Sequence, residues 1–325
     1  MRAVICRAFA PYTELTLETV PDPVAAAGEL LLEVGAAGVN FLDSLIVEGK
    51  YQTKPTLPFS PGTEVAGTVR ALGPGTAGPA PGTRVLAFAS YGGYAEQLAV
   101  PAAQAFPIPA TMSEAEAAGF AIVYGTSYHA LVDRAALRPG ETLVVLGAAG
   151  GVGLTAVELG KRLGARVIAA ASSDEKLALC RRYGADDTIN YAREDLRERV
   201  RTLTAGRGAD VVYDPVGASY AEPMVRGLAV GGRYLVIGFA AGEIPRIPLN
   251  LLLLKQAAIV GVFFGAWARA NPGRSAANMA TMLRWYERGE LKPHVSASYP
   301  LERFADALRA VVAREVTGKA VLTMR

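Results

Sequence analysis

The feature that most constrains this chain is a short apolar run that ends in a cluster of glycines. The run, Leu143–Leu146, is followed by seven small residues up to Gly153 and then by helical spacing over 154–163. This order predicts a buried parallel strand that turns tightly into a helix. Because the turn carries little side chain, its backbone N–H groups can approach a pyrophosphate at the positive end of the helix. A dinucleotide is therefore the natural ligand.

The glycine pattern departs from the strict G-x-G-x-x-G fingerprint. Read from Ala148, the spacing is A-x-G-x-x-G, so an alanine takes the place of the tight-turn glycine. A glycine-rich turn of any α/β protein is the alternative interpretation of this pattern alone. The surroundings favour a dinucleotide, since a second buried strand is predicted over 165–172 and the whole βαβ unit has about the 30 residues it needs. The predicted cofactor-binding residues of the turn are Ala148, Gly150, Gly151, Val152 and Gly153.

The end of the second strand indicates which dinucleotide binds. An NAD site carries Asp or Glu there, about 20 residues past the glycines, to hold the ribose 2′-OH. This chain has Ser172, followed by Ser173 and Lys176. Two hydroxyls and an ammonium suit a 2′-phosphate better than a diol, so we predict NADPH. Asp174 argues for NAD, although residues 173–175 equally suit the N-cap and first turn of the next helix.

Composition narrows the class of protein. The length of 325 residues suggests two domains, and 51% hydrophobic with 19% charged residues is typical of a globular chain. No apolar run has the length of a membrane span and the first 20 residues lack a signal-peptide core, so we expect a soluble, cytoplasmic protein without a membrane partner. Cys6 and Cys180 form no CxxC motif. The net charge of +3 is modest and dispersed, so nucleic acid is not an expected primary partner.

The pattern of predicted strands, helices and turns changes along the chain. Residues 1–122 contain short predicted strands between glycine and proline turns, which is typical of a small, partly closed barrel. From 123 to 265 helices alternate with buried strands, so we predict a doubly wound parallel sheet. Residues 266–325 return to a different pattern and are predicted to rejoin the first domain. The predicted fold class is α/β, a Rossmann-type sheet plus a β-barrel domain.

Several short motifs together resemble a known family. They are Gly38-Val39-Asn40, Gly49-Lys50-Tyr51, Pro61-Gly62-Thr63-Glu64, Gly92-Gly93-Tyr94-Ala95-Glu96, the turn from Ala148 to Gly153, and Gly238-Phe239. In this order they resemble the zinc-independent medium-chain dehydrogenase/reductases, in the NADPH:quinone oxidoreductase branch related to ζ-crystallin. The resemblance implies a GroES-like catalytic domain from 1–122 and 266–325, a Rossmann NADP-binding domain over 123–265, and a nicotinamide in the cleft. It also implies hydride transfer to quinones or to α,β-unsaturated carbonyl compounds.

The same resemblance argues against a metal. Zinc-bearing members of the superfamily have a Cys in the place of Asn40 and a His in the place of Thr63. This chain has neither, and its only histidines are His129 and His294. The usual tetrahedral zinc ligands are missing, so no metal site is predicted.

The resemblance implies three side chains around the reaction, and each has a structural alternative. Asn40 is a candidate for acceptor contact, or a turn residue that bonds its own backbone. Asp43 is a candidate catalytic group, or a helix cap or salt-bridge partner. Tyr51 matches an acid or orienting tyrosine of related enoyl reductases, or it is one of 13 tyrosines that simply pack. Further cofactor contacts implied by the family are Asn40, Thr126, Lys176, Tyr191, Gly238, Phe239, Phe264 and Lys319, where each lysine could instead be a solvated surface charge.

The predicted function is an NADPH-dependent quinone or enone oxidoreductase. One alternative is an enoyl-thioester reductase, which would need a long channel and a basic mouth for the nucleotide of coenzyme A. Another is a non-catalytic dinucleotide-binding structural or RNA-binding protein. The apolar segment Ala258–Phe264 is predicted to be an edge strand. We therefore expect a homodimer closed by a two-fold axis.

Overall fold

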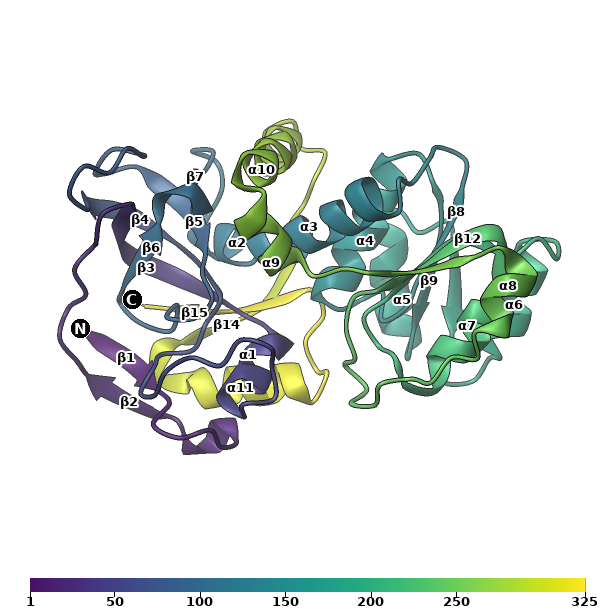
Figure 1. Cartoon of the computed structure of the whole chain (residues 1–325), viewed down its shortest axis with the longest axis horizontal. Coiled ribbons are helices and arrows are strands. Elements are labelled where there is room, and N and C mark those ends of the chain that lie inside the picture. Colours follow the sequence, from purple (N-terminus) through teal and green to yellow (C-terminus); the bar gives the residue numbers. More distant parts are fainter. Residues whose placement is uncertain (325) are drawn as a thin grey trace. The chain divides into compact units, whose positions relative to one another are not determined.

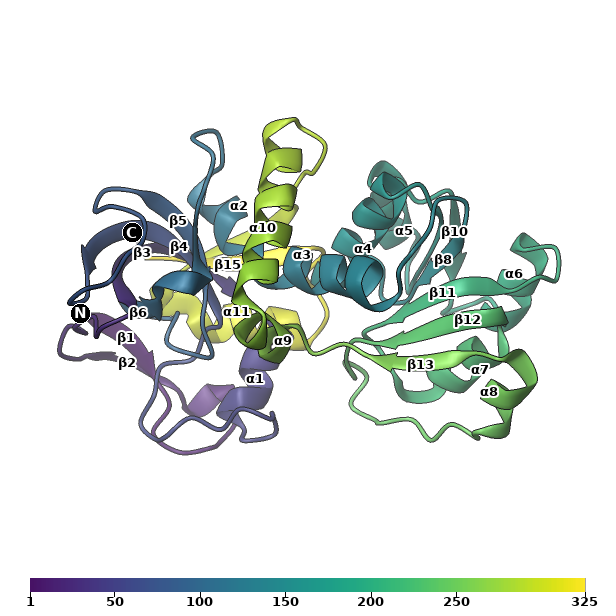
Figure 2. The same cartoon turned by 45° about the horizontal axis from the view of Figure 1, so that its top comes forward.

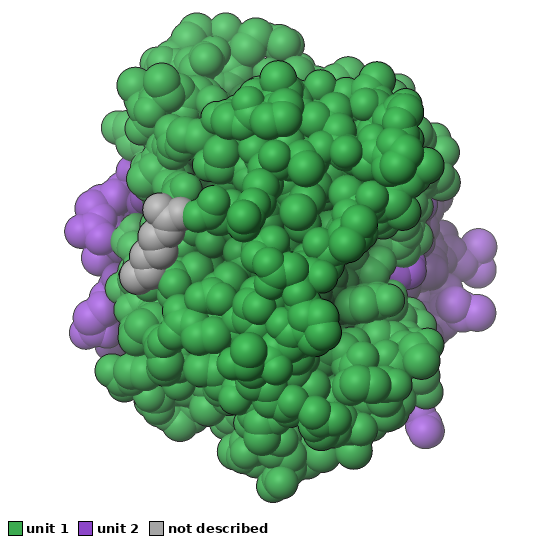
Figure 3. Space-filling model, turned by 90° about the vertical axis from the view of Figure 1, so that its left-hand side faces the viewer, with its two compact units in different colours: residues 1–122, 265–325 green, residues 123–264 purple. Residues whose placement is uncertain are grey.

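The computed structural model describes residues 1–324, which form two compact units (Figures 1 and 3). Unit 1 comprises residues 1–122 together with the segment that starts at Gly265, and unit 2 comprises Val123–Phe264. None of the helices in residues 1–324 is both long enough and apolar enough to cross a lipid bilayer.

Unit 1 is built on a seven-stranded sheet in which β3 is central. Strands run in the order β14-β15-β3-β4-β5-β7, and β6 also pairs with β3. The last strand of the chain, β15, pairs antiparallel with β3, so the C-terminal segment belongs to this sheet. The bounds of the strands, with the separate β1-β2 pair, are β1 Arg2–Ile5, β2 Thr16–Thr19, β3 Glu29–Val39, β4 Glu64–Leu72, β5 Arg84–Phe88, β6 Gln97–Pro101, β7 Ala105–Pro107, β14 Val295–Pro300 and β15 Lys319–Thr323.

Short helices pack around this sheet. Helix α2 begins with a capping box, in which Ser113 Oγ accepts from the Glu116 N–H at 3.2 Å and Glu116 Oε2 accepts from the Ser113 N–H at 3.0 Å. Helix α11 packs its apolar face against the sheet through buried side chains such as Leu308. The helices of this unit are α1 Phe41–Val47, α2 Glu114–Ala118, α9 Phe264–Ala270 (whose first residue lies in unit 2), α10 Pro272–Glu287 and α11 Phe304–Val312.

Unit 2 is a doubly wound parallel sheet, as predicted. Its strand order is β10-β9-β8-β11-β12-β13, and every neighbouring pair is parallel. Strands β8, β9 and β11 are almost entirely buried, which is typical of a sheet covered on both faces, whereas the edge strand β13 is largely exposed. The strands of this sheet are β8 Thr142–Val145, β9 Arg166–Ala171, β10 Asp187–Asn190, β11 Ala209–Asp214, β12 Leu228–Val236 and β13 Ala258–Gly261.

Helices cover this sheet, and α6, α7 and α8 share one apolar cluster with the strands (Figure 2). One expected boundary differs from the structure. The strand expected over Ala258–Phe264 ends at Gly261, and helix α9 begins at Phe264. A short apolar run does not reveal by periodicity where a strand ends and a helix begins. The helices are α3 Ala121–Tyr128, α4 Gly151–Arg162, α5 Asp174–Arg182, α6 Leu196–Leu203, α7 Ala221–Arg226 and α8 Asn250–Lys255.

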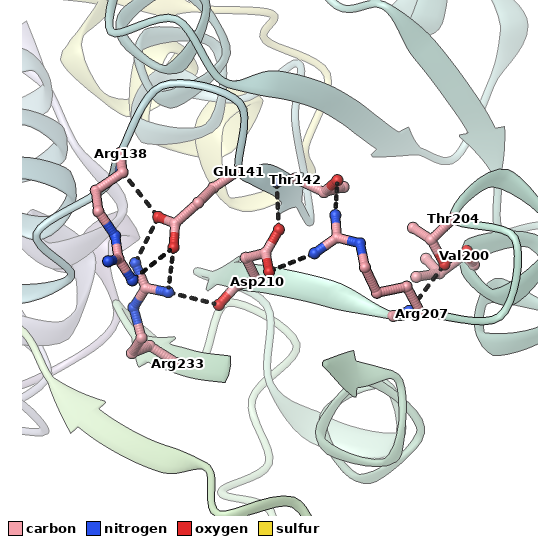
Figure 4. Close-up of polar contacts among 9 residues, drawn as sticks. Arg138, Glu141, Thr142, Val200, Thr204, Arg207, Asp210 and Arg233 are labelled. Atoms are coloured by element: carbon pink, nitrogen blue, oxygen red, sulfur yellow. Dashed lines mark hydrogen bonds and ion pairs between the residues drawn. The ribbon is translucent and has the colours of Figure 1, made fainter. Parts of the chain in front are cut away.

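A charged network fastens the end of the unit 2 sheet where β8 and β11 begin (Figure 4). The Glu141 carboxylate accepts from both terminal nitrogens of Arg233, at 2.9 and 2.7 Å. Asp210 accepts from the Thr142 N–H at 2.7 Å and from Arg207 at 2.6 Å. These bonds join β8, β11 and β12. They hold the register of the strands whose opposite, carboxyl ends carry the candidate site.

Candidate functional site

The turn after β8 has the geometry of an anion cradle. Gly147 adopts a left-handed conformation with φ +56°, and Gly150 is the N-cap of α4. The Ala148 N–H donates to Ala170 O of β9 at 3.0 Å, which fixes the turn against the next strand. The residue with a positive φ in this turn is therefore Gly147, one position before Ala148, where the A-x-G-x-x-G spacing begins. Gly147 is the glycine that directly follows the apolar run.

Gly153 lets α4 pack closely on this turn. A Cβ at Gly153 would lie 2.2 Å from Gly147 O and 2.9 Å from Ala148 Cα, so no side chain fits. Gly151, Val152 and Gly153 form the first turn of α4, where backbone N–H groups have no partner within the helix. A turn with no side chain larger than a methyl group in front of these N–H groups fits the pyrophosphate of a dinucleotide.

Three buried hydroxyl groups form hydrogen bonds with one another and with the first turn of α4. Ser127 Oγ lies 2.8 Å from Thr155 Oγ1 and 2.9 Å from the Tyr213 hydroxyl, and it donates to Val152 O at 3.0 Å. These contacts tie α3, α4 and β11 together. None of these three hydroxyl groups could be predicted, because a single polar residue in an apolar run gives no periodic signal.

Two of the residues that the family resemblance placed at the cofactor lie near these hydroxyls. Thr126 is half-buried beside Ser127. Phe264 is buried, and its ring packs so closely on α3 that a Cβ on Gly125 would lie 2.4 Å from it. The Phe264 side chain therefore has a packing role within unit 2.

The residues after β9 form the second part of the site. Ser172 is exposed, and Ser173 is the N-cap of α5, where its hydroxyl accepts from the Lys176 N–H at 3.4 Å. The Tyr191 N–H donates to Ala171 O at 3.1 Å, which brings the start of the Tyr191 segment beside Ser172. Ser172 and Tyr191 therefore lie together at the carboxyl end of β9, with Lys176 on the first turn of α5.

Asp174, which argued for NAD, is engaged by other side chains. Its carboxylate accepts from Asn190 Nδ2 at 2.9 Å and from Arg193 Nη2 at 2.6 Å. These two hydrogen bonds hold the pKa of the Asp174 carboxyl below its usual range. The carboxylate is thus ionised and paired with a cation.

The loops after β11 and β12 complete the carboxyl edge of the sheet. Asp214 is buried and accepts from the N–H groups of Val216 and Gly217, at 2.6 and 2.9 Å, and from the Tyr234 hydroxyl. Burial raises the pKa of the Asp214 carboxyl. Sequence analysis missed this carboxylate, which shapes the loop beside β8. Gly238 and Phe239 follow β12, and the Phe239 ring lies against Gly217.

The strand order reverses between β8 and β11, because β9 lies beyond β8 and β12 lies beyond β11. In open parallel sheets, ligands bind outside the carboxyl ends of the strands at such a switch point. The turn at Gly147 follows β8, and the loop shaped by Asp214 follows β11. Both therefore lie where this architecture holds a ligand.

In unit 1 three of the candidate residues, Asn40, Asp43 and Lys319, lie in a buried polar cluster. We use this name for six side chains, Asn40, Asp43, Thr63, Glu64, Tyr94 and Lys319. Within this cluster, the Asp43 carboxylate is the acceptor for three hydrogen bonds. It accepts from the Asn40 N–H and the Tyr94 hydroxyl, both at 2.8 Å, and from Thr63 Oγ1 at 3.1 Å. Burial raises the pKa of Asp43 to about 6.

This position corrects the expected role of Asp43. Its side chain is 0% exposed, so it does not reach a substrate. It caps the first turn of α1 through the Asn40 N–H, which agrees with the structural alternative for this residue. Asp43 is therefore a positioning residue.

Lys319 also differs from the expectation that it contacts the cofactor. Its ammonium donates to Val39 O at 3.0 Å and to Asn40 Oδ1 and Glu64 Oε1, both at 2.7 Å. An ammonium has three N–H donors, and these bonds use all of them. Lys319 is buried inside unit 1 with no donor left for a phosphate, so its predicted role at the cofactor is corrected.

Asn40 and Tyr51 are the remaining candidates in unit 1. The Asn40 amide is oriented by Lys319 at its oxygen and by Glu64 Oε1, which accepts from Nδ2 at 2.9 Å. Tyr51 is half-buried and packs against the core of unit 1. Burial, together with the charge of Asp43, raises the pKa of the Tyr51 phenol, which keeps it protonated at neutral pH. In residues 1–324, no three His, Cys, Asp or Glu side chains are grouped as metal ligands.

Comparison with known proteins agrees with these features. Residues 26–110 match the alcohol dehydrogenase GroES-like domain, and residues 151–285 match the model described as zinc-binding dehydrogenase. The chain is 39% identical over 300 residues to a quinone oxidoreductase-like protein 2 homolog of Nematostella vectensis, covering 91% of this chain and 82% of the relative.

Solved structures give the same result over the full length. The quinone oxidoreductase of Thermus thermophilus, also solved as its complex with NADPH, is 36% identical with a TM-score of 0.87, and the match covers 100% of both chains. The quinone oxidoreductase of Escherichia coli, complexed with NADPH, is 27% identical with a TM-score of 0.93, covering 99% of this chain and 100% of that one. With its glycine turn, its doubly wound sheet and Asn40 and Thr63 where zinc-bearing members carry ligands, the chain belongs to the zinc-independent quinone oxidoreductase family of the medium-chain dehydrogenases/reductases, a family of oxidoreductase enzymes.

Proposed function

We propose that this chain is an NADPH-dependent oxidoreductase that reduces quinones or α,β-unsaturated carbonyl compounds without a metal. The observation that carries the proposal is the carboxyl edge of the unit 2 sheet. There, an anion cradle at Gly147 and Gly153 stands beside a ribose position, Ser172, that lacks a carboxylate of its own. Relatives that were solved with NADPH support this choice of cofactor.

Each unit has its own role in this proposal. Unit 2 binds the dinucleotide, with the first turn of α4 at the pyrophosphate and Ser172, Lys176 and Tyr191 at the 2′-phosphate. The bound cofactor supplies hydride. Unit 1 binds the acceptor and supplies Tyr51, whose phenol donates a hydrogen bond to the acceptor oxygen as negative charge develops there. Asn40, held by Lys319 and Glu64, orients the bound ligands.

The test is a spectrophotometric screen of quinones, enones and enoyl thioesters with NADPH. We expect NADPH oxidation with quinones or simple enones. Reaction with enoyl thioesters alone would favour an acyl-CoA type reductase, and tight NADPH binding without any turnover would favour a non-catalytic dinucleotide-binding protein.

The choice of NADPH is tested at Lys176. A charge-assisted phosphate contact is worth about 1.5 to 3 kcal/mol. Lys176→Ala should therefore raise the KM for NADPH about tenfold or more, with little change for NADH. An equal loss with both cofactors would refute the assignment of Lys176 to the 2′-phosphate.

We also propose a homodimer that works in the cytoplasm. Strand β13 lies at the edge of the unit 2 sheet (Figure 2). Nearby apolar side chains are exposed, including Ile259 on β13 and Leu253 on α8. An apolar edge strand favours pairing with a second copy about a two-fold axis. Cys6 and Cys180 are both buried free thiols, which suits a reducing compartment.

A further inference from the structure

The ion pair between Asp174 and Arg193 lies at the part of unit 2 that we assign to the 2′-phosphate. Asp174 is two residues past Ser172, and Arg193 is two residues past Tyr191. Arg193 Nη2 lies 2.6 Å from each carboxylate oxygen of Asp174. The pair therefore links the first turn of α5 to the segment that follows β10.

Asn190 fixes the direction in which the Asp174 carboxylate points. Asn190 is buried, its Oδ1 accepts from the Ala192 N–H at 3.2 Å, and its Nδ2 donates to Asp174 Oδ1 at 2.9 Å. Both the oxygen and the nitrogen of the Asn190 amide are hydrogen-bonded, so the amide has a fixed orientation. Asn190 therefore holds the Asp174 carboxylate toward β10, while Arg193 offsets its charge.

A free carboxylate at this place would favour the opposite cofactor. An acidic side chain after the second strand accepts hydrogen bonds from a ribose 2′-OH, and it repels a 2′-phosphate. Pairing with a guanidinium weakens both effects, since it uses acceptor sites on both oxygens and offsets the charge.

We propose that Arg193 is a specificity-determining residue, which makes the site selective for a 2′-phosphorylated dinucleotide by holding and neutralising Asp174. The inference rests on the proposed function only in that NADPH is the cofactor. It does not depend on the identity of the electron acceptor. Arg193 is thus a positioning residue for Asp174.

The test measures binding of the adenosine half of the cofactor and needs no turnover. We would titrate 2′,5′-ADP and 5′-AMP by calorimetry into the full chain carrying Arg193→Ala, Asp174→Asn or both changes. Arg193→Ala should weaken 2′,5′-ADP about tenfold, equivalent to about 1.4 kcal/mol, without weakening 5′-AMP. Adding Asp174→Asn should restore 2′,5′-ADP binding to within about threefold of the original, because the uncompensated charge is gone.

A matched control is available on α6. Arg201 pairs with Glu198, and these side chains are 65% and 53% exposed, against 64% and 57% for Arg193 and Asp174. Exposed pairs contribute little to stability, so all these variants should fold. Arg201→Ala should leave both affinities unchanged.

Three outcomes would overturn the inference. They are unchanged 2′,5′-ADP binding in Arg193→Ala, a loss that Asp174→Asn does not restore, and an equal loss of 5′-AMP. A failure of the proposed function looks different. If the unaltered chain bound 2′,5′-ADP no better than 5′-AMP, the NADPH assignment and the inference would both fail, whereas correct binding without quinone or enone reduction would refute only the activity.

Discussion

Lys319 Nζ lies 2.7 Å from Glu64 Oε1, although the two residues are separated by 255 positions, and both side chains are buried. The Lys319 ammonium also holds Val39 O and Asn40 Oδ1, and the second Glu64 oxygen accepts from the Ile122 N–H at 2.8 Å. A buried pair is tolerated only when such bonds satisfy its remaining donors and acceptors. The pair therefore ties the last strand of the chain to the turn that carries Asn40.

The first prediction concerns this pair. Lys319→Met should lower the free energy of unfolding by about 3 to 5 kcal/mol, because it leaves the Glu64 carboxylate buried without a counter-charge. Adding Glu64→Gln should recover part of the loss, since the buried group is then neutral. Urea unfolding measures both effects. Arg288→Ala, which breaks the exposed pair with Glu290, should cost less than about 1 kcal/mol, and a similar small cost for Lys319→Met would contradict the prediction.

The second prediction concerns pH. The folded-state pKa of Asp43, about 6, lies above the unfolded-state value of about 4. Between these values the folded chain keeps a proton that the unfolded chain has released. The contribution of Asp43 to the free energy of unfolding is therefore fully present below about pH 4 and falls by up to about 3 kcal/mol as the pH rises through 6.

The measurement compares the unaltered chain with Asp43→Asn from pH 4 to 7. The stability of the unaltered chain relative to the variant should decline across this range. Asp306→Asn, at a side chain 43% exposed, provides the control and should show no such decline. If the difference in the free energy of unfolding between the unaltered chain and Asp43→Asn stayed constant with pH, the raised pKa of Asp43 would be disproved.

Much of unit 2 could be predicted because its signals are local. Strands β8 and β9 consist mainly of buried apolar residues, and the turn at Gly147 follows the apolar run Leu143–Leu146 directly, so the order of these elements indicates a doubly wound sheet. The positive φ of Gly147 could not be predicted, since the sequence shows several nearby glycines but not which one has a positive φ.

The polar contacts could not be predicted because their partners are distant in the chain. A lysine at the start of a strand resembles a surface residue until β15 is placed beside β3, and only then does Lys319 meet Glu64. The carboxylate of Asp174 posed the same problem. Its sequence position suits NAD, and only the fold brings Arg193 and Asn190 to it.

The third prediction concerns the close packing of α4 on the turn. Gly153→Ala would place a Cβ 2.2 Å from Gly147 O, so the helix must move away from the cradle. We expect a loss of about 1 to 3 kcal/mol in stability and a clear loss of NADPH affinity, measured by thermal unfolding and fluorescence titration. Gly273→Ala in α10 meets nothing within 4 Å and should keep the affinity. Unchanged NADPH binding in Gly153→Ala would show that the turn does not form the cradle.

The fourth prediction concerns assembly. If β13 pairs with a second copy, Ile259→Lys should place a charge in the apolar contact and give a monomer. Light scattering over a dilution series would show this change. Val24→Lys, at an exposed position of unit 1, should keep the dimer. An unaltered chain that is monomeric at every concentration would rule out the proposed pairing.

The last prediction concerns Tyr51 as the donor to the acceptor oxygen. Hydride delivery leaves negative charge on that oxygen, so without a metal a positioned donor should be worth about 10²-fold in turnover with an enone. The raised pKa of the Tyr51 phenol keeps its proton in place at neutral pH. Tyr51→Phe should therefore lower turnover with an enone about 10²-fold at saturating NADPH, and less with a quinone, whose anion is more stable and can take its proton from water. Tyr12→Phe is the matched control, because Tyr12 also packs half-buried against the core of unit 1 and should change neither rate. If Tyr51→Phe left the turnover of both acceptors unchanged, Tyr51 would have only a packing role, and bound water would be the source of the proton for the acceptor oxygen.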